Sequence, residues 1–235
     1  MKRRLLSGTA FGVAGERAAS GFLRTFHAGE DLLVTLALGG MALLPLVDIP
    51  LRAAAGWTIP ASATLVQHLT LFVGMLGAAV AAREGRLLAL STGASLLSGR
   101  SQSLATLFSQ AVAAAVTLLL CVASIQFVRT ERQAGAILTG SIPVWVAQLM
   151  LPLGFALVAI RLLKSSSPTW RGRAVATALT VLIIALGAHP PMPRDQLVLP
   201  ALLILLLATA LGAPVFTALG GAALILFWGE SVPIA

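Results

Sequence analysis

Charged residues are scarce in this chain. Only 10% of the 235 residues are Asp, Glu, Lys or Arg, and 58% are hydrophobic. A soluble globular domain has about 25% charged and about 45–50% apolar residues. The mean hydropathy of +0.96 agrees with this excess of apolar side chains. Because so few charges cannot cover a surface facing water, the composition predicts an integral membrane protein.

Residues and motifs of metal and nucleophile chemistry are also nearly missing. The single cysteine, Cys121, excludes an intrachain disulfide framework and a cysteine-based zinc site. The three histidines, His27, His68 and His189, are scattered, so no shared metal site is expected. There is no nucleophile elbow, zinc-protease helix or phosphate-binding loop motif. We therefore predict that the chain is not an enzyme and binds no metal or cofactor.

The net charge of +8 would suggest nucleic-acid binding in a soluble protein. Here the basic residues fall between apolar segments, where Lys and Arg mark cytoplasmic loops, so no nucleic-acid partner is expected. Counted over alternate connections, twelve basic residues lie on the side of the N-terminus and four on the other. The twelve are Lys2, Arg3, Arg4, Arg17, Arg24, Arg83, Arg86, Arg100, Arg161, Lys164, Arg171 and Arg173. This asymmetry predicts a cytoplasmic N-terminus.

Long apolar segments set the fold class. Crossing a hydrocarbon core of about 30 Å takes about 20 apolar residues in a helix, and an open strand would leave backbone groups unpaired in lipid. The sequence therefore predicts an all-α membrane protein with about six transmembrane helices. The expected spans are 32–51, 62–82, 104–128, 142–163, 174–189 and 197–228.

Two segments outside these spans have their own interpretations. Residues 1–28 begin like a secretory signal, but polar residues dilute their apolar part, which favours a cytoplasmic N-terminal arm. Residues 87–99 are too short to span and have apolar side chains on one helical face. They predict a helix lying in the membrane interface, with a plain polar loop as the alternative.

Ionisable residues inside a membrane are costly and are usually functional, and the predicted spans contain few. Asp48 and Arg52 are four residues apart, so they can pair on one helical face. They serve either as a structural anchor or in docking a partner. His68 is the only titratable group deep in a span, and it either packs between helices or relays protons.

A possible helix break lies inside the last span. Gly212 and Pro214 both weaken a helix there. The segment is therefore either two half-helices, as in transporter sites, or one helix with a simple proline kink.

Several motifs, in this order, resemble a known family. Residues 77–79 are Gly-Ala-Ala and residues 83–86 are Arg-Glu-Gly-Arg, similar to a stretch in the small subunits (DctQ type) of TRAP transporters. Residues 142–145 (Ile-Pro-Val-Trp) and 151–154 (Leu-Pro-Leu-Gly) resemble that family's fourth helix. Residues 211–220 and 227–235 resemble the opening segment of the large, DctM-type subunit.

The resemblance implies a four-helix small-subunit domain at 29–163, a linker and linking helix at 164–195, and a truncated start of the large subunit at 196–235. It implies a scaffold for a sodium-coupled importer of organic acids in the bacterial inner membrane. Its partners would be the large permease subunit, possibly fused, a periplasmic binding protein of the DctP type, and lipid.

In that family the substrate and sodium sites lie in the large subunit, so none is expected here. Arg83 and Arg86 join Asp48, Arg52 and His68 as candidates for partner docking or structural anchoring. The alternatives are a membrane assembly protein unrelated to transport and an intramembrane enzyme.

Overall fold

The computed structural model of the chain describes residues 7–89, 97–139, 142–191 and 193–230, with side chains from residue 24 onward except at 139 and 195. Nearly all of the described chain is helical. The elements in chain order are α1 (Ser7–Ala55), α2 (Ser62–Glu84), α4 (Arg100–Ala134), β1 (Ile137–Thr139), β2 (Ile142–Pro143), α5 (Val144–Gln148), α6 (Met150–Ser165), α7 (Trp170–Ala188), α8 (Arg194–Ala210) and α9 (Val215–Gly229).

Five described helices are long and apolar enough to cross a membrane. They contain or nearly match the first five predicted spans, since the candidate segments are Arg24–Ala55, Ser62–Glu84, Arg100–Ala134, Val144–Ser165 and Trp170–Ala188. The prediction of an all-α membrane protein is confirmed. The first helix starts at Ser7 without a break near residue 28, so the predicted N-terminal arm is helical where it is described.

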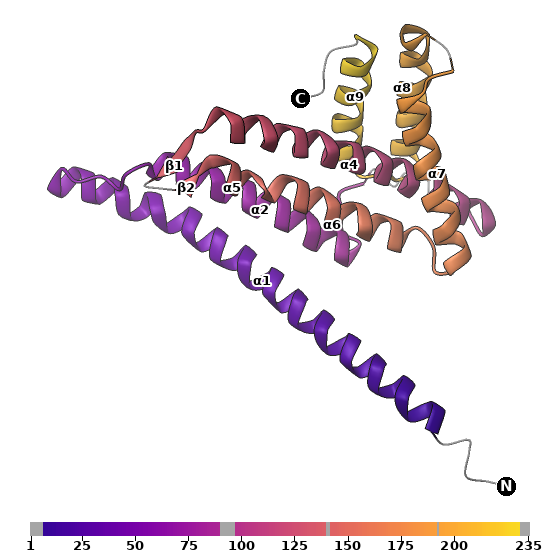
Figure 1. Cartoon of the computed structure of the whole chain (residues 1–235), viewed down its shortest axis with the longest axis horizontal. Helices are drawn as coiled ribbons and strands as arrows, with labels where there is room; N and C mark the ends of the chain where they lie inside the picture. The colour runs from indigo at the N-terminus through magenta and orange to yellow at the C-terminus, as the bar shows by residue number, and fades with distance from the viewer. Residues whose placement is uncertain (1–6, 90–96, 140–141, 192, 231–235) are drawn as a thin grey trace.

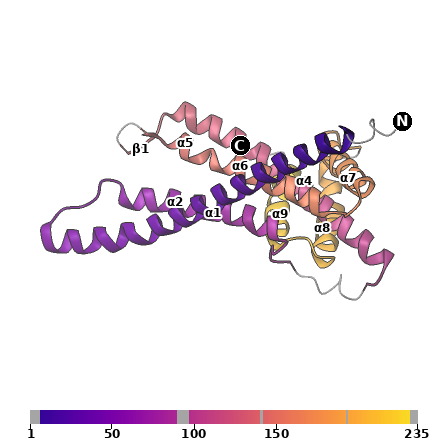
Figure 2. The same cartoon turned by 90° about the horizontal axis from the view of Figure 1, so that it is seen from below.

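Neighbouring helices form a layer in which α1 packs on α2, α2 on α6, and α6 on α4. The turn between α1 and α2 and the short β1–β2 hairpin both lie toward the same end of the molecule (Figures 1 and 2). Helices α7, α8 and α9 run across the direction of α2, α4 and α6 (Figure 1). The four-helix unit therefore has the up-and-down connectivity expected from its span order.

The sixth predicted span, 197–228, is wrong as a single crossing. Its residues form α8 and α9, two shorter apolar helices that pack against each other as a hairpin. Gly212 has a φ of 104°, which other residues rarely adopt, and Pro214 precedes the first residue of α9. The chain therefore does break at Gly212 and Pro214, and the break is a complete turn rather than a kink.

The turn of this hairpin is anchored to the segment after α2. The Val215 amide donates a hydrogen bond of 2.9 Å to the Leu88 carbonyl, and Ala89 forms a bridge with Pro214. Residues 87–89 are therefore not helical, and neither are residues 97–99. The predicted interfacial helix at 87–99 does not include these ends, and its centre, 90–96, lies outside the described residues.

The core lies where small residues let helices approach closely. Ala113 and Ala114 of α4 are fully buried, as are Ala208 of α8 and Ala213 in the hairpin turn. The Thr180 hydroxyl of α7 donates a hydrogen bond of 3.1 Å to the Ala111 carbonyl of α4. Small side chains and interhelical hydrogen bonds are what hold helices together in lipid, where burial of apolar surface gives little driving force.

Candidate functional site: a buried ion-pair network joining three helices

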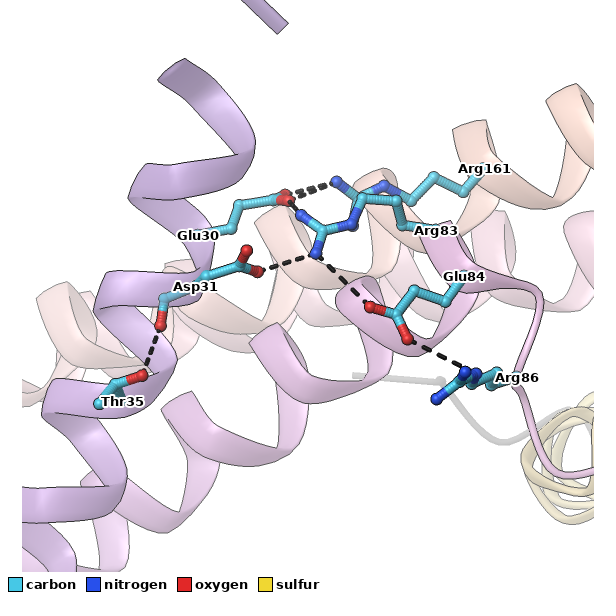
Figure 3. A network of polar contacts seen from close by, with 7 residues as sticks. All are labelled: Glu30, Asp31, Thr35, Arg83, Glu84, Arg86 and Arg161. Atoms are coloured by element: carbon cyan, nitrogen blue, oxygen red, sulfur yellow. Dashed lines mark hydrogen bonds and ion pairs between the residues drawn. The ribbon is translucent and has the colours of Figure 1, made fainter. Parts of the chain in front are cut away.

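Glu30 of α1 is the centre of a charged network (Figure 3). Its side chain is 5% exposed. Its carboxylate accepts hydrogen bonds from Arg161 Nη2 of α6 at 2.5 and 2.7 Å, and from Arg83 Nη1 of α2 at 3.2 Å. One acidic side chain therefore joins three helices that lie far apart in sequence.

More exposed charges surround this centre. Arg83 Nη2 donates a hydrogen bond of 2.8 Å to Asp31 Oδ1 and lies 3.8 Å from Glu84 Oε1. Glu84 in turn lies 3.7 Å from the Nε of Arg86, whose side chain is largely exposed (Figure 3). The network thus contains three carboxylates and three guanidinium groups, and their formal charges cancel.

The local sequence explains where Arg83 lies. Gly85 adopts a φ of 67° and ends α2, and its amide donates to the Ala81 carbonyl. This left-handed conformation is one that glycine adopts at little cost. Arg83 is therefore held in the last turn of α2, where its positive charge is also favoured by the helix dipole. In this chain the glycine of the Arg-x-Gly pattern ends the helix, and the arginine two residues earlier lies in its last turn.

The network can fix helix positions. Removing one partner of a buried ion pair leaves the other charge uncompensated, at a cost of about 3–5 kcal/mol. Arg161 is 11% exposed, and its Nη1 is buried without a hydrogen-bond partner among the described residues. Both oxygens of the Glu30 carboxylate accept hydrogen bonds from Arg161. Loss of this carboxylate would therefore leave the charge of Arg161 uncompensated. The six side chains of the network include no nucleophile paired with a base. We therefore interpret the network as holding the helices in position.

The predicted pair of Asp48 and Arg52 is present near the C-terminal end of α1. Arg52 Nη2 donates to Asp48 Oδ2 at 2.6 Å, while the Ile59 amide and the Ser62 hydroxyl donate to the same carboxylate at 2.7 and 3.0 Å. Asp48 is buried and Arg52 is largely exposed. The carboxylate therefore fastens the connection between α1 and α2, which is the contact expected of a structural anchor.

His68 does not join either cluster. Its Nδ1 lies 2.8 Å from the Thr64 carbonyl, one turn earlier in α2, and the ring is half-buried. Fifteen residues separate it from Arg83, which is about 22 Å along a helix. Of the predicted candidates, the structure therefore brings Arg83 and Arg86 together, pairs Asp48 with Arg52, and leaves His68 apart from both.

Four members of the network were not predicted as site residues from the sequence: Glu30, Asp31, Glu84 and Arg161. The first predicted span began at residue 32, directly after the acidic pair, whereas the described helix extends through it. Arg161 contributes to the charge asymmetry that predicts the topology, and no local pattern in the sequence pairs it with an acid. An adjacent pair of acids entering an apolar helix, in a chain with so few acids, was the available signal.

Metal binding has no support among the residues that the structure describes. They contain no group of three or more His, Cys, Asp or Glu side chains that could hold a metal ion.

A layer of helices joined by a buried charge network, in a chain with five described helices long and apolar enough to cross a membrane, is typical of a multi-pass membrane protein. Comparison with family profiles finds the one for tripartite ATP-independent periplasmic transporters, DctQ component, at residues 41–172. This match covers more than half of the chain, so the chain belongs to the DctQ family. Comparison with curated proteins finds no match.

The family match includes α2, α4, α5 and α6 and the C-terminal part of α1. It confirms the predicted resemblance to a TRAP transporter small subunit, and it makes the chain a transporter component rather than a member of an enzyme family. It ends before residues 196–235, so the predicted fusion to a large subunit is not shown.

Proposed function

We propose that this chain is the scaffold of a transporter for sodium-coupled uptake of organic acids. The observation that carries the proposal is the closed charge network around Glu30, in a chain of the DctQ family. A transport path through a membrane needs polar groups that are free to bind substrate or ion. The network's central groups instead bind each other, so the substrate and sodium sites belong to a partner subunit.

The partners follow from the same assignment. The large permease subunit of the DctM type binds beside the helical layer, and a periplasmic binding protein of the DctP type delivers the substrate. The hairpin of α8 and α9 is the contact with the permease, or its first segment. Large apolar side chains on α8, such as Leu199, Leu203 and Leu206, are exposed and available for such packing. The chain needs no cofactor of its own, because the sodium gradient supplies the free energy.

The orientation in the membrane follows from charge. Arg83, Arg86 and Arg161 lie close together (Figure 3), at or just after the C-terminal end of α2 and near the C-terminal end of α6. Under the positive-inside rule these ends face the cytoplasm. The N-terminus then lies in the cytoplasm of a bacterium, and the chain lies in the inner membrane.

A depletion experiment in the native host tests this function with a mixture of candidate substrates. Cells with and without the chain are incubated with a range of organic acids, with either sodium or potassium as the external cation. Mass spectrometry of the medium measures which acids disappear. We expect at least one acid to be depleted only when both the chain and sodium are present. Identical depletion with and without the chain would contradict the proposed function.

A further inference from the structure

A small cavity lies at the end of the helical layer opposite the Glu30 network. It has a volume of about 210 Å³ and is found between the C-terminal turns of α4 and the start of the α5–α6 segment. Its lining residues are Ile125, Val128, Arg129, Arg132, Trp145, Leu149 and Pro152. The Cys121 thiol donates to the Pro152 carbonyl at 3.4 Å, so α4 and α6 meet directly below it.

The lining has a regular polarity. On α4, the apolar residues Ile125 and Val128 are followed by Arg129 and Arg132, so all four lie on one helical face. The arginines are in the last two turns of the helix. The facing wall changes in the same direction, from Pro152 and Leu149 inside the apolar segment to Trp145 at its entry. The cavity is therefore apolar at its deep end and cationic at its outer end.

The two arginines are not neutralised within the described part of the chain. Among the described residues, neither guanidinium forms an ion pair with a carboxylate, and Arg132 lies 5.3 Å from the centre of the Trp145 ring. Glu131 is adjacent in sequence but points to another side of the helix, since successive residues are about 100° apart. A negative charge bound here would thus meet two cations, both with exposed side chains, beside the apolar lining of the cavity.

The apolar surface continues below the cavity. Val122, one turn deeper on α4, and Leu153 on α6 are 53% and 59% exposed. A hydrocarbon chain that started in the cavity would therefore continue along the outside of the helices. Tryptophan at the mouth is typical of the level of lipid headgroups. A carboxylate of a water-soluble partner would bind to the arginines but would make no use of the apolar wall. The apolar wall therefore favours a ligand with a hydrocarbon chain.

We propose that this cavity is a binding site for an anionic phospholipid. Its phosphate lies between Arg129 and Arg132, the first part of one acyl chain fills the apolar end of the cavity, and the rest of the lipid covers the exposed surface below. The pairing of a guanidinium with a phosphate is charge-assisted and therefore strong. The bound lipid would fill the space that protein side chains leave empty between α4 and the α5–α6 segment.

Native mass spectrometry of the purified full chain tests this site. The protein is titrated with phosphatidylglycerol against a background of phosphatidylcholine, and the fraction of chain with bound phosphatidylglycerol is measured. Each of the two arginines contributes a charge-assisted attraction to the lipid phosphate. We therefore expect the double variant Arg129→Gln, Arg132→Gln to weaken phosphatidylglycerol binding by about tenfold or more. The variant Arg129→Lys, Arg132→Lys keeps the charges and should bind within about threefold of the original chain.

The matched control removes two exposed arginines elsewhere, Arg100→Gln and Arg171→Gln, and should leave binding unchanged. An equal loss in the control and test variants would show general charge attraction and would overturn the site. Unchanged binding in the test variant would also overturn it, and would leave the arginines to a protein partner. Competition by inorganic phosphate alone, as effective as by phosphatidylglycerol, would show an anion site that does not select lipid and would overturn the proposal as well.

Discussion

Replacing Glu30 with glutamine is expected to cause the largest loss of stability of any single change in the charge network. The variant keeps the shape of the side chain but removes the negative charge between Arg83 and Arg161. These arginines are 19% and 11% exposed. Because breaking a buried ion pair costs about 3–5 kcal/mol, we expect a loss of about that size in the free energy of unfolding, measured in detergent micelles.

Asp31 provides the matched control for Glu30. It is the next residue on the same helix and also pairs with Arg83, but its side chain is 55% exposed. An exposed pair contributes about 0–1 kcal/mol, so Asp31→Asn should lower stability by no more than that. The double variant Glu30→Gln with Arg161→Gln should lose less free energy of unfolding than the two single variants lose in total. Equal effects at Glu30 and Asp31 would show that burial of the network does not stabilise the fold.

The second large effect is expected at Gly154, where α6 lies against α2. A Cβ atom at this position would lie 2.8 Å from the Cβ and 2.6 Å from the Cε of Met75. The methionine tip can move, but its Cβ is fixed to α2, so the helices must separate. Overpacking of this kind costs about 1–3 kcal/mol, and we expect Gly154→Val to lower the free energy of unfolding by that amount.

Gly77 is the control for this substitution. It lies within α2, and a Cβ atom there would have no neighbour within 4 Å. Gly77→Val changes helix propensity in the same way as Gly154→Val, so the difference between them isolates the contact with Met75. If both variants have the same free energy of unfolding, the close approach of α2 and α6 in the structure is wrong.

The membrane-spanning helices could be predicted from the sequence because the length of an apolar run and the charges at its ends are enough to locate them. A stretch such as Arg100–Ala134 contains an apolar run far longer than a soluble helix needs, and its ends are marked by charge. The same rule failed for residues 197–228. Their total length fits one crossing, but Gly212 and Pro214 turn the chain back, and two shorter helices can satisfy the same hydropathy.

The ion-pair network could not be predicted by such local rules. Glu30 and Arg161 are 131 positions apart, and each was interpretable by itself as a charge at the end of a span. Only the packing of α1 on α2, and of α2 on α6, brings them together. The Asp48–Arg52 pair, in contrast, was predictable because helical periodicity alone puts residues four apart on one face.

Co-purification most directly tests the central claim that this chain is the scaffold of a larger transporter. The tagged chain is isolated from its native cells in mild detergent, and mass spectrometry identifies the proteins that accompany it. We predict recovery of a large permease subunit, either as a separate chain or as an extension of this one beyond Ala235. Recovery of the 235-residue chain alone, from cells that express such a permease, would contradict this claim.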